Sequence, residues 1–276
     1  MLILRTFNRH IYKLLKFTKI MPTIKGIALD LEGTVVDVEK AHHLGHIRAA
    51  EEFGVTLTLD DCFRLLPHFI GGPDDQVAWE IANLASESNR QVDYKDVLEA
   101  KKRHYRDVLK EIDIKPRPGF IDFFAFAQNL IYEDDGIKLF GHTIGSLTER
   151  EYAEILLYRS GILDLFGGYD NVVLREDVQN PKPAPDVWIE TARRAGVNPD
   201  EQIIFEDSPR GVEGGVQIGA YCIGMPTYNR PDAVTSLVKA GVKRVFMSWD
   251  EINPEALFFN AYHEHEDKTL KISYIN

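Results

Sequence analysis

Acidic side chains follow two separate apolar runs of the sequence. Asp30 and Glu32 come directly after the run 27–29, and Glu206 with Asp207 follows a second such run. A short apolar run that ends in a carboxylate is typical of a buried strand, and the carboxyl ends of strands form the ligand-binding edge of an open α/β sheet. Carboxylates held together there repel each other and favour a hard cation such as Mg²⁺ between them.

A hydroxyl and a lysine lie between these acids in the chain. Ser146 follows a predicted strand, and the pattern from Thr148 to Glu151 predicts a capping box that opens a helix. A hydroxyl beside free helix N–H groups can hold anionic oxygens. Lys182 lies among three prolines that stiffen the backbone around its ammonium group. A carboxylate nucleophile, a hydroxyl, a lysine and metal-binding acids together predict phosphoryl transfer.

The order of these motifs resembles that of the haloacid dehalogenase superfamily. Its members have Asp-x-Asp-Gly-Thr, then Ser or Thr, then Lys, then Glu-Asp or Asp-Asp. This chain has, in the same order, Asp30-Leu31-Glu32-Gly33-Thr34, Ser146, Lys182 and Glu206-Asp207. The resemblance is nearest to the β-phosphoglucomutase and phosphoglycolate phosphatase group. It implies an α/β fold, with a doubly wound parallel-sheet, Rossmann-like core and an inserted α-helical cap.

The resemblance also implies a role for each motif. Asp30 would be the nucleophile that forms an aspartyl-phosphate, with Lys182 stabilising the charge and Ser146 binding the phosphate. Mg²⁺ would be held by Asp30, Asp207 and the backbone carbonyl of Glu32. Glu206 would bind the metal less directly, for instance through water.

Glu32 stands where most members of the family have an aspartate. The resemblance implies that its carboxyl group protonates the leaving oxygen and then activates the attacking water. Enolase-phosphatases of the family also have glutamate there, so the residue is compatible with hydrolysis. The alternative is that Glu32 serves only the metal site, through its carbonyl.

Substrate contacts are expected from the inserted helices. His42 lies twelve residues after Asp30, where β-phosphoglucomutases have a histidine, and His68 lies where related caps have a specificity loop. The loop continues into Asp74 and Asp75 rather than the basic residues of mutases, which counts against a mutase. Four basic residues of a later helix are expected to be solvated or to meet a substrate anion: Lys101, Lys102, Arg103 and Arg106.

Three functions remain open on this evidence. The first is a Mg²⁺-dependent phosphatase that hydrolyses a small phosphate monoester, such as a sugar phosphate. The second is a β-phosphoglucomutase-like phosphomutase, which His42 favours. The third, motivated by Glu32, is a catalytically weak phospho-ligand-binding protein.

Alternating helix and strand patterns predict the elements that position these residues. Apolar spacing predicts helices near 38–53, 59–66, 74–86 and 93–112. Afterwards, helices alternate with strands near 138–144, 171–174, 203–205, 221–224 and 244–247, as a parallel sheet requires. We therefore expect an N-terminal extension at 1–22, a core at 23–38 and 118–250, a helical cap at 39–117 and a C-terminal tail at 251–276.

The composition is ordinary for a soluble enzyme, with 44% hydrophobic and 27% charged residues among 276. A net charge of −11 argues against a nucleic-acid partner. Cys62 and Cys222 are far apart and favour free thiols in a reducing compartment. The expected partner is a small phosphorylated metabolite and the expected location is the cytoplasm, while the oligomeric state stays open.

The start of the chain departs from this acidic balance. No acidic residue precedes Asp30, and four basic residues recur at helical spacing opposite an apolar face: Arg5, Arg9, Lys13 and Lys16. Such a helix fits a mitochondrial presequence or weak membrane-surface contact. The alternative is that translation starts at Met21. No segment is long and apolar enough to span a bilayer.

Overall fold

The computed structural model describes residues 24–69, 72–86, 91–128, 131–132, 137–138, 141–258 and 261. Six parallel strands form one sheet in the order β5-β4-β1-β6-β7-β8. Their bounds are β1 Gly26–Leu29, β4 Gly141–Gly145, β5 Val172–Val173, β6 Gln202–Glu206, β7 Tyr221–Gly224 and β8 Arg244–Val245. A separate antiparallel pair joins β2 (Ile131–Tyr132) to β3 (Ile137–Lys138). The parallel sheet predicted from the sequence is confirmed.

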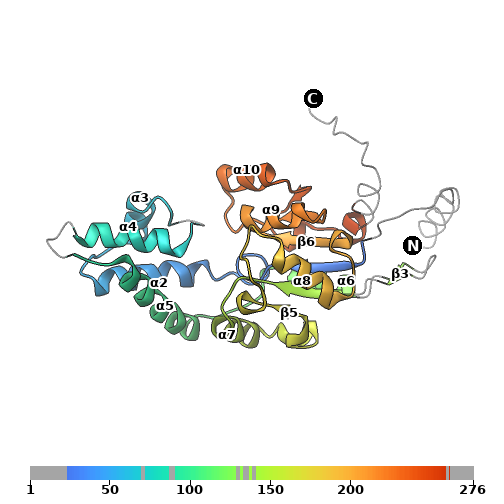
Figure 1. The fold of residues 1–276 in the computed structure, drawn as a ribbon, viewed down its shortest axis with the longest axis horizontal. Coiled ribbons are helices and arrows are strands. Elements are labelled where there is room, and N and C mark those ends of the chain that lie inside the picture. The colour runs from blue at the N-terminus through green and yellow to red at the C-terminus, as the bar shows by residue number, and fades with distance from the viewer. Residues whose placement is uncertain are drawn as a thin grey trace, which may run out of the picture.

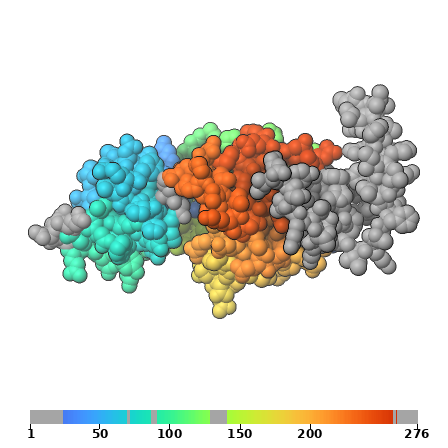
Figure 2. All heavy atoms as spheres, turned by 90° about the horizontal axis from the view of Figure 1, so that it is seen from above, coloured from blue at the N-terminus to red at the C-terminus, as the bar shows by residue number. Residues whose placement is uncertain are grey.

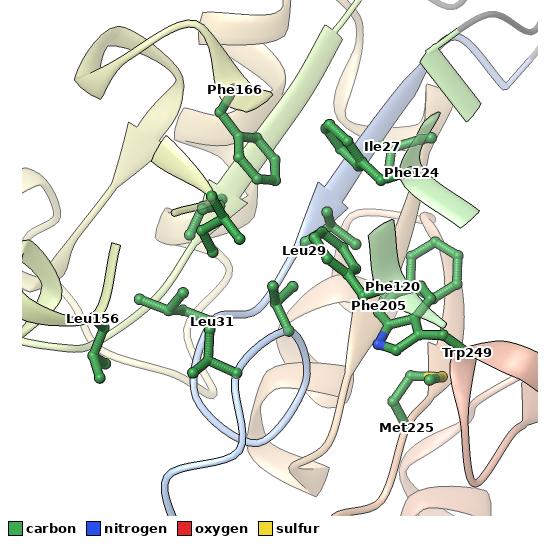
Figure 3. Close-up of a cluster of buried hydrophobic side chains, with 14 of the residues drawn as sticks. Ile27, Leu29, Leu31, Phe120, Phe124, Leu156, Phe166, Phe205, Met225 and Trp249 are labelled. Carbon is green, nitrogen blue, oxygen red and sulfur yellow. The ribbon is translucent and has the colours of Figure 1, made fainter. Parts of the chain in front are cut away.

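Helices cover both faces of this sheet (Figure 1). Ile27, Leu29 and Phe205 point to the face that carries α6 (Phe120–Gln128) and α7 (Arg150–Ser160). Ala28 and Ile204 point to the opposite face, against α8 (Asp186–Ala195), α9 (Pro209–Gln217) and α10 (Pro231–Ala240). Because both faces are buried, β1, β5 and β7 are apolar at every position rather than at alternate ones. Figure 3 shows the first face, where Leu29 and Phe205 pack near Phe120 and Trp249.

Four helices between β1 and α6 form a lobe beside the sheet, which we call the helical insert (Figures 1 and 2). They are α2 (Glu39–Glu52), α3 (Leu59–Leu65), α4 (Asp74–Ser86) and α5 (Tyr94–Glu111). The insert has its own apolar cluster, separate from the two clusters of the sheet. α3 begins with a capping box between Thr58 and Asp61, which satisfies two free backbone N–H groups. Among the described residues, no helix is long and apolar enough to cross a membrane.

Packing of the core continues beyond residue 250, where the sequence suggested a tail. Leu257, Phe258 and Ala261 are buried in the same cluster as the strands of β1 and β6. The apolar residues of this short stretch therefore belong with the core. The N-terminal extension expected at 1–22 lies outside the described residues, and so does the tail after Ala261. The boundary of the cap at 39–117 stays a prediction.

Candidate active site

Asp30 and Lys182 meet at the carboxyl edge of the sheet. β1 ends at Leu29 and pairs with β6, so Asp30 lies beside the acids that end β6. The Lys182 ammonium donates to Asp30 Oδ1 at 2.6 Å, to Glu206 Oε1 at 2.7 Å and to the carbonyl of Gly145 at 3.2 Å. All three residues are buried, with exposed fractions of 6% or less. A lysine 152 residues away in the chain is thus held against the proposed nucleophile.

A third carboxylate completes this cluster. Oxygen atoms of Asp30, Glu206 and Asp207 all lie within 4.8 Å of one another. Thr227 Oγ1 donates to Asp207 Oδ2 at 2.9 Å, and the backbone N–H of Ser208 donates to the other oxygen of Glu206 at 2.6 Å. Glu206 is therefore held from both sides. Hard carboxylate oxygens at this separation fit a divalent cation such as Mg²⁺.

The pKa values of these groups show that burial and mutual repulsion disfavour the ionised forms of Asp30 and Asp207. Burial raises the pKa of Asp30 to about 7, with the charge of Lys182 opposing the rise and that of Glu206 adding to it. Burial also raises the pKa of Asp207 well above its usual range, and Glu206 and Asp30 push it further. Burial lowers the pKa of Lys182, but the charges of Asp30 and Glu206 outweigh it and raise the pKa overall. Such mutual repulsion is what a bound cation would relieve.

Gly33 and Arg117 fix the loop that follows β1. Gly33 has φ of +80°, and a Cβ there would lie 2.1 Å from Asp207 Oδ2, so no larger residue fits without displacing that acid. The Arg117 guanidinium donates to the carbonyl of Gly33 at 2.5 Å and to that of Met225 at 2.8 Å. It also reaches the carbonyls of Pro226 and Met247, at 3.3 and 2.8 Å. One side chain thus joins three loops at the sheet edge.

Glu32 points from the same loop towards the helical insert. Its Oε1 accepts a hydrogen bond from the Tyr105 hydroxyl at 2.9 Å, and its Oε2 lies 3.2 Å from Nε2 of His42. Burial raises the pKa of Glu32, but the hydrogen bonds from His42 and Tyr105 and the charge of Lys101 outweigh burial and lower it. Glu32 is therefore held ionised by the insert in this arrangement.

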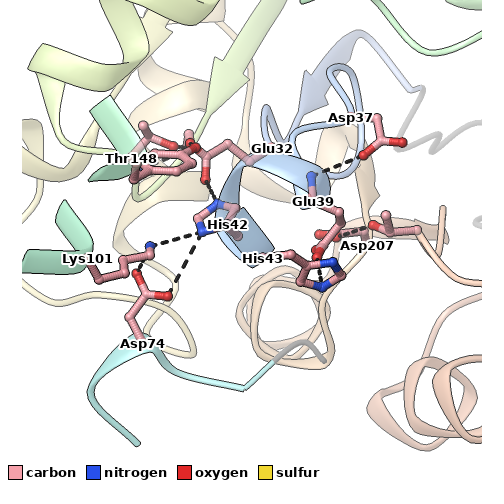
Figure 4. A network of polar contacts seen from close by, with 12 residues as sticks. Glu32, Asp37, Glu39, His42, His43, Asp74, Lys101, Thr148 and Asp207 are labelled. Atoms are coloured by element: carbon pink, nitrogen blue, oxygen red, sulfur yellow. Dashed lines mark hydrogen bonds and ion pairs between the residues drawn. The ribbon is translucent and has the colours of Figure 1, made fainter. Parts of the chain in front are cut away.

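A chain of contacts continues from His42 into the insert (Figure 4). Lys101 Nζ lies 3.0 Å from Nδ1 of His42 and forms an ion pair with Asp74. Because an ammonium group only donates, Nδ1 must accept and the proton of neutral His42 stays on Nε2, facing Glu32. His46 Nε2 contacts the other oxygen of Asp74 at 3.0 Å.

These residues line a cavity of about 460 Å³ between the sheet edge and the insert. Its carboxylate residues are Asp30, Glu32, Glu39, Asp74, Glu149, Glu206 and Asp207. Its lysine and arginine residues are Lys101, Lys102, Lys182 and Arg210. Aromatic and apolar side chains such as Phe69, Tyr105 and Leu147 complete the wall. A cavity of this size accommodates a small metabolite.

Residues 27–225 match the haloacid dehalogenase-like hydrolase family. The chain belongs to this family. It is thereby an enzyme of the hydrolase class, and curated relatives are named as phosphatases. The phosphorylated carbohydrates phosphatase of Thermotoga maritima is 29% identical over 71% of this chain and 82% of its own. The fructose-1-phosphate phosphatase YqaB of Escherichia coli is 26% identical over 70% of this chain and 92% of its own.

Solved structures share the fold of this hydrolase. A family IA, variant 3 hydrolase from Entamoeba histolytica superposes with a TM-score of 0.67 and 21% identity, over 86% of this chain and 99% of its own. A putative β-phosphoglucomutase from Thermotoga maritima superposes with a TM-score of 0.62 and 22% identity, over 84% of this chain and 98% of its own. At these identities the likeness establishes the fold alone.

The hydrolase brings most of the residues singled out in its sequence into one cavity. Asp30, Glu32, His42, Lys182, Glu206, Asp207 and Ser146 all line it. His68 does not: its ring is half exposed and pairs with Glu80 at 2.5 Å. His68 was expected to lie in a specificity loop, but its side chain pairs with Glu80 of α4 instead of facing the cavity.

Ser146 differs from expectation in its surroundings. The capping box predicted from Thr148 to Glu151 is wrong, because α7 begins at Arg150 after Glu149 without a side-chain cap. Thr148 instead turns its hydroxyl to Ser146 Oγ, at 2.8 Å, and its backbone N–H donates to the same oxygen at 3.2 Å. One backbone N–H group that was expected to be free near Ser146 is therefore already bonded to the Ser146 hydroxyl.

Three contributors to the site had no recognisable motif in the sequence: Tyr105, Lys101 and Arg117. Lys101 is 2% exposed and lies on the buried face of α5 with Val97 and Tyr105, four residues before and after it. That helical spacing was a signal that Lys101 faces inwards. Arg117 has no such periodicity, since it lies in the segment that returns from the insert to the core.

Proposed function

We propose that this hydrolase is a Mg²⁺-dependent phosphatase that cleaves a small phosphate monoester, such as a sugar phosphate, through an aspartyl-phosphate at Asp30. The observation that carries the proposal is the contact between Asp30 and Lys182, 2.6 Å apart, within a buried cluster of carboxylates. The names of the relatives, which act on phosphorylated carbohydrates and fructose 1-phosphate, support the same substrate class. The helical insert would act as the cap over the cavity.

Two displacements at phosphorus make up the proposed reaction. A carboxylate oxygen of Asp30 attacks phosphorus, the bond to the ester oxygen breaks, and that oxygen takes a proton as the alcohol leaves. Water then attacks the acyl phosphate, releasing inorganic phosphate and restoring the carboxylate. Lys182 balances negative charge near Asp30 throughout, without having to move. Ser146 would bind a phosphate oxygen.

Glu32 is the proposed acid and base of these steps. The ionised form that Tyr105 and His42 stabilise is the one that accepts a proton from water in the second step. An anionic phosphate next to Glu32 favours the neutral form, which the first step needs. Its contacts with the insert would thus couple proton transfer to the position of the insert.

Asp30, Asp207 and the carbonyl of Glu32 would hold the metal, with Glu206 contributing less directly because Lys182 and Ser208 already engage its oxygens. When bound, Mg²⁺ neutralises phosphate charge and so lowers its repulsion of the incoming carboxylate.

Phosphate release from a sugar-phosphate panel tests this proposal. Asp30→Asn is expected to lose turnover by several orders of magnitude, since an amide cannot form the acyl phosphate. Asp37→Asn is the matched control, because Asp37 is a nearby exposed acid that does not line the cavity. Acid quenching of the wild type during turnover should yield a phosphorylated Asp30 peptide. Normal rates in Asp30→Asn would disprove the mechanism.

A phosphomutase is the second candidate, because His42 contacts Glu32. Interconversion of sugar-phosphate isomers without phosphate release would support it. Binding without either reaction would support the third possibility, a phospho-ligand-binding protein. The cytoplasmic location and the alternative mitochondrial one stay predictions.

A further inference from the structure

Negative charge predominates on the walls of the active-site cavity. Seven carboxylate residues and four lysine or arginine residues line it, an excess of three formal negative charges. A bound divalent cation would still leave one. A cavity that must hold an anionic phosphate therefore has little capacity for a second anion.

Three of the four lining cations are already paired. Lys182 contacts Asp30 and Glu206, Lys101 pairs with Asp74, and Lys102 lies 3.2 Å from Glu149. Within the described part of the chain, only Arg210 lines the cavity without a carboxylate within ion-pair distance. Arg210 lies at the start of α9, where it donates to the carbonyl of Lys182. The unpaired positive charge is thus on the core side, next to the backbone of Lys182.

The insert side of the cavity keeps its lysine neutralised. Asp74 is the first residue of α4, and it contacts both Lys101 and His46. Burial raises the pKa of Asp74, but the hydrogen bond from His46 and the charge of Lys101 outweigh burial and lower it. Asp74 therefore stays ionised, and Lys101, which is 2% exposed, presents no free charge to a ligand.

We propose, on the basis of the phosphatase function proposed above, that the cavity selects phosphate monoesters whose remaining part carries no second anionic group. A second phosphate or a carboxylate would meet ionised side chains on the insert side with no free cation to receive it. Neutral hydroxyl groups, by contrast, can donate hydrogen bonds to those carboxylates. Selection would thus come from repulsion of the wrong ester as much as from attraction of the right one.

Two matched pairs of esters test this selectivity. We would compare fructose 1-phosphate with fructose 1,6-bisphosphate, and glucose 6-phosphate with 6-phosphogluconate, at constant ionic strength. In each pair, the ester whose phosphate is its only anionic group is expected to have a kcat/KM at least about tenfold higher, the scale of one partly screened unit charge. Equal values, or a preference for the second anion, would overturn the proposal.

The role of Asp74 in this selectivity can be tested separately from that of the net charge of the cavity. Within each pair, the ratio of kcat/KM for the ester without a second anionic group to that for the ester with one is the measure of selectivity. Asp74→Asn is expected to reduce this ratio by about tenfold, because Lys101 loses its partner. Asp75→Asn is the matched control, since Asp75 is exposed, neighbours Asp74 and does not line the cavity. A ratio compares two esters on the same protein, so a general loss of folded enzyme cancels. An unchanged ratio in Asp74→Asn would refute the role of this residue.

A binding measurement distinguishes failure of this inference from failure of the phosphatase proposal. Absence of phosphate release from every ester by the wild type would refute the phosphatase. Titration calorimetry of the same four esters with Asp30→Asn needs no turnover. Weaker binding of the two esters that carry a second anionic group would support the selectivity even then, and equal binding would overturn it.

Discussion

Replacement of Arg117 by methionine should cost the hydrolase much of its stability. The guanidinium donates to four backbone carbonyls from three loops, and methionine supplies no donor to any of them. A hydrogen bond to a charged group contributes about 1.5–3 kcal/mol, but the four are not additive. Arg117 is also only partly buried, so water can replace some of them. We expect Arg117→Met to lower the free energy of unfolding by about 4 kcal/mol.

Urea denaturation followed by tryptophan fluorescence measures this loss, and Trp249 is the tryptophan that lies among the loops that Arg117 joins. Its indole is buried and donates to the carbonyl of Thr34 at 3.0 Å, in the loop that Arg117 binds through Gly33. Arg159→Met is the matched control. Arg159 also donates to three carbonyls, at the end of α5, but it is exposed. Because water can satisfy those carbonyls, its loss should be below about 1 kcal/mol.

Activity should fall with stability in Arg117→Met, because the Gly33 carbonyl belongs to the loop that carries Asp30 and Glu32. Arg117→Lys should recover only part of the stability, since lysine is a point charge with three donors instead of a planar group with five. The reasoning would be refuted by a loss below about 1 kcal/mol in Arg117→Met, or by equal losses in the Arg117 and Arg159 variants.

Three further predictions concern the site and its surroundings. Glu32→Gln should slow hydrolysis of alkyl phosphates by about 10²–10⁴-fold and that of an aryl phosphate much less, since only the former needs a proton on its leaving oxygen; equal losses would assign Glu32 to the metal site. Chelation with EDTA should abolish turnover and added Mg²⁺ restore it, whereas full activity in excess chelator would exclude the metal. Burial lowers the pKa of His43 to about 4. The unfolded chain therefore takes up this proton first, and stability should fall by up to about 3 kcal/mol as the pH drops from about 6.5 to 4. A His43→Asn variant should show a flatter pH dependence of its melting temperature, and an identical profile would contradict the assignment.

Much of the sheet could be predicted because several of its buried parallel strands, such as β1 and β7, are continuous apolar runs. The strand predicted at 221–224 and the helix predicted at 74–86 have the bounds found in the structure. The strand predicted at 138–144 overlaps two elements of the structure, because β3 ends at Lys138 and β4 runs from Gly141 to Gly145. The carboxyl ends of β1 and β6 then bring Asp30 and Asp207 together for the reason expected, since the two strands are neighbours.

Such local patterns could not predict contacts between segments that are far apart in the sequence. Lys101 was expected to be solvated or to meet a substrate anion, yet it is buried against Asp74, 27 residues away. Its burial is tolerable only because a carboxylate neutralises it, and no local pattern indicates which acid does so. Arg117 was not identified because its partners are backbone carbonyls, which every residue has.

Asp30 and Glu32 are two residues apart, but they face different parts of the molecule. Asp30 is hydrogen-bonded to Lys182 of the core, whereas Glu32 is hydrogen-bonded to Tyr105 and His42 of the insert. The longer side chain of glutamate suits this division, because its carboxylate meets both insert residues while its backbone stays in the β1 loop. A movement of the insert would break these bonds without touching the contact between Asp30 and Lys182. The proposed nucleophile is thus held independently of the insert, and the proposed proton donor is held by it.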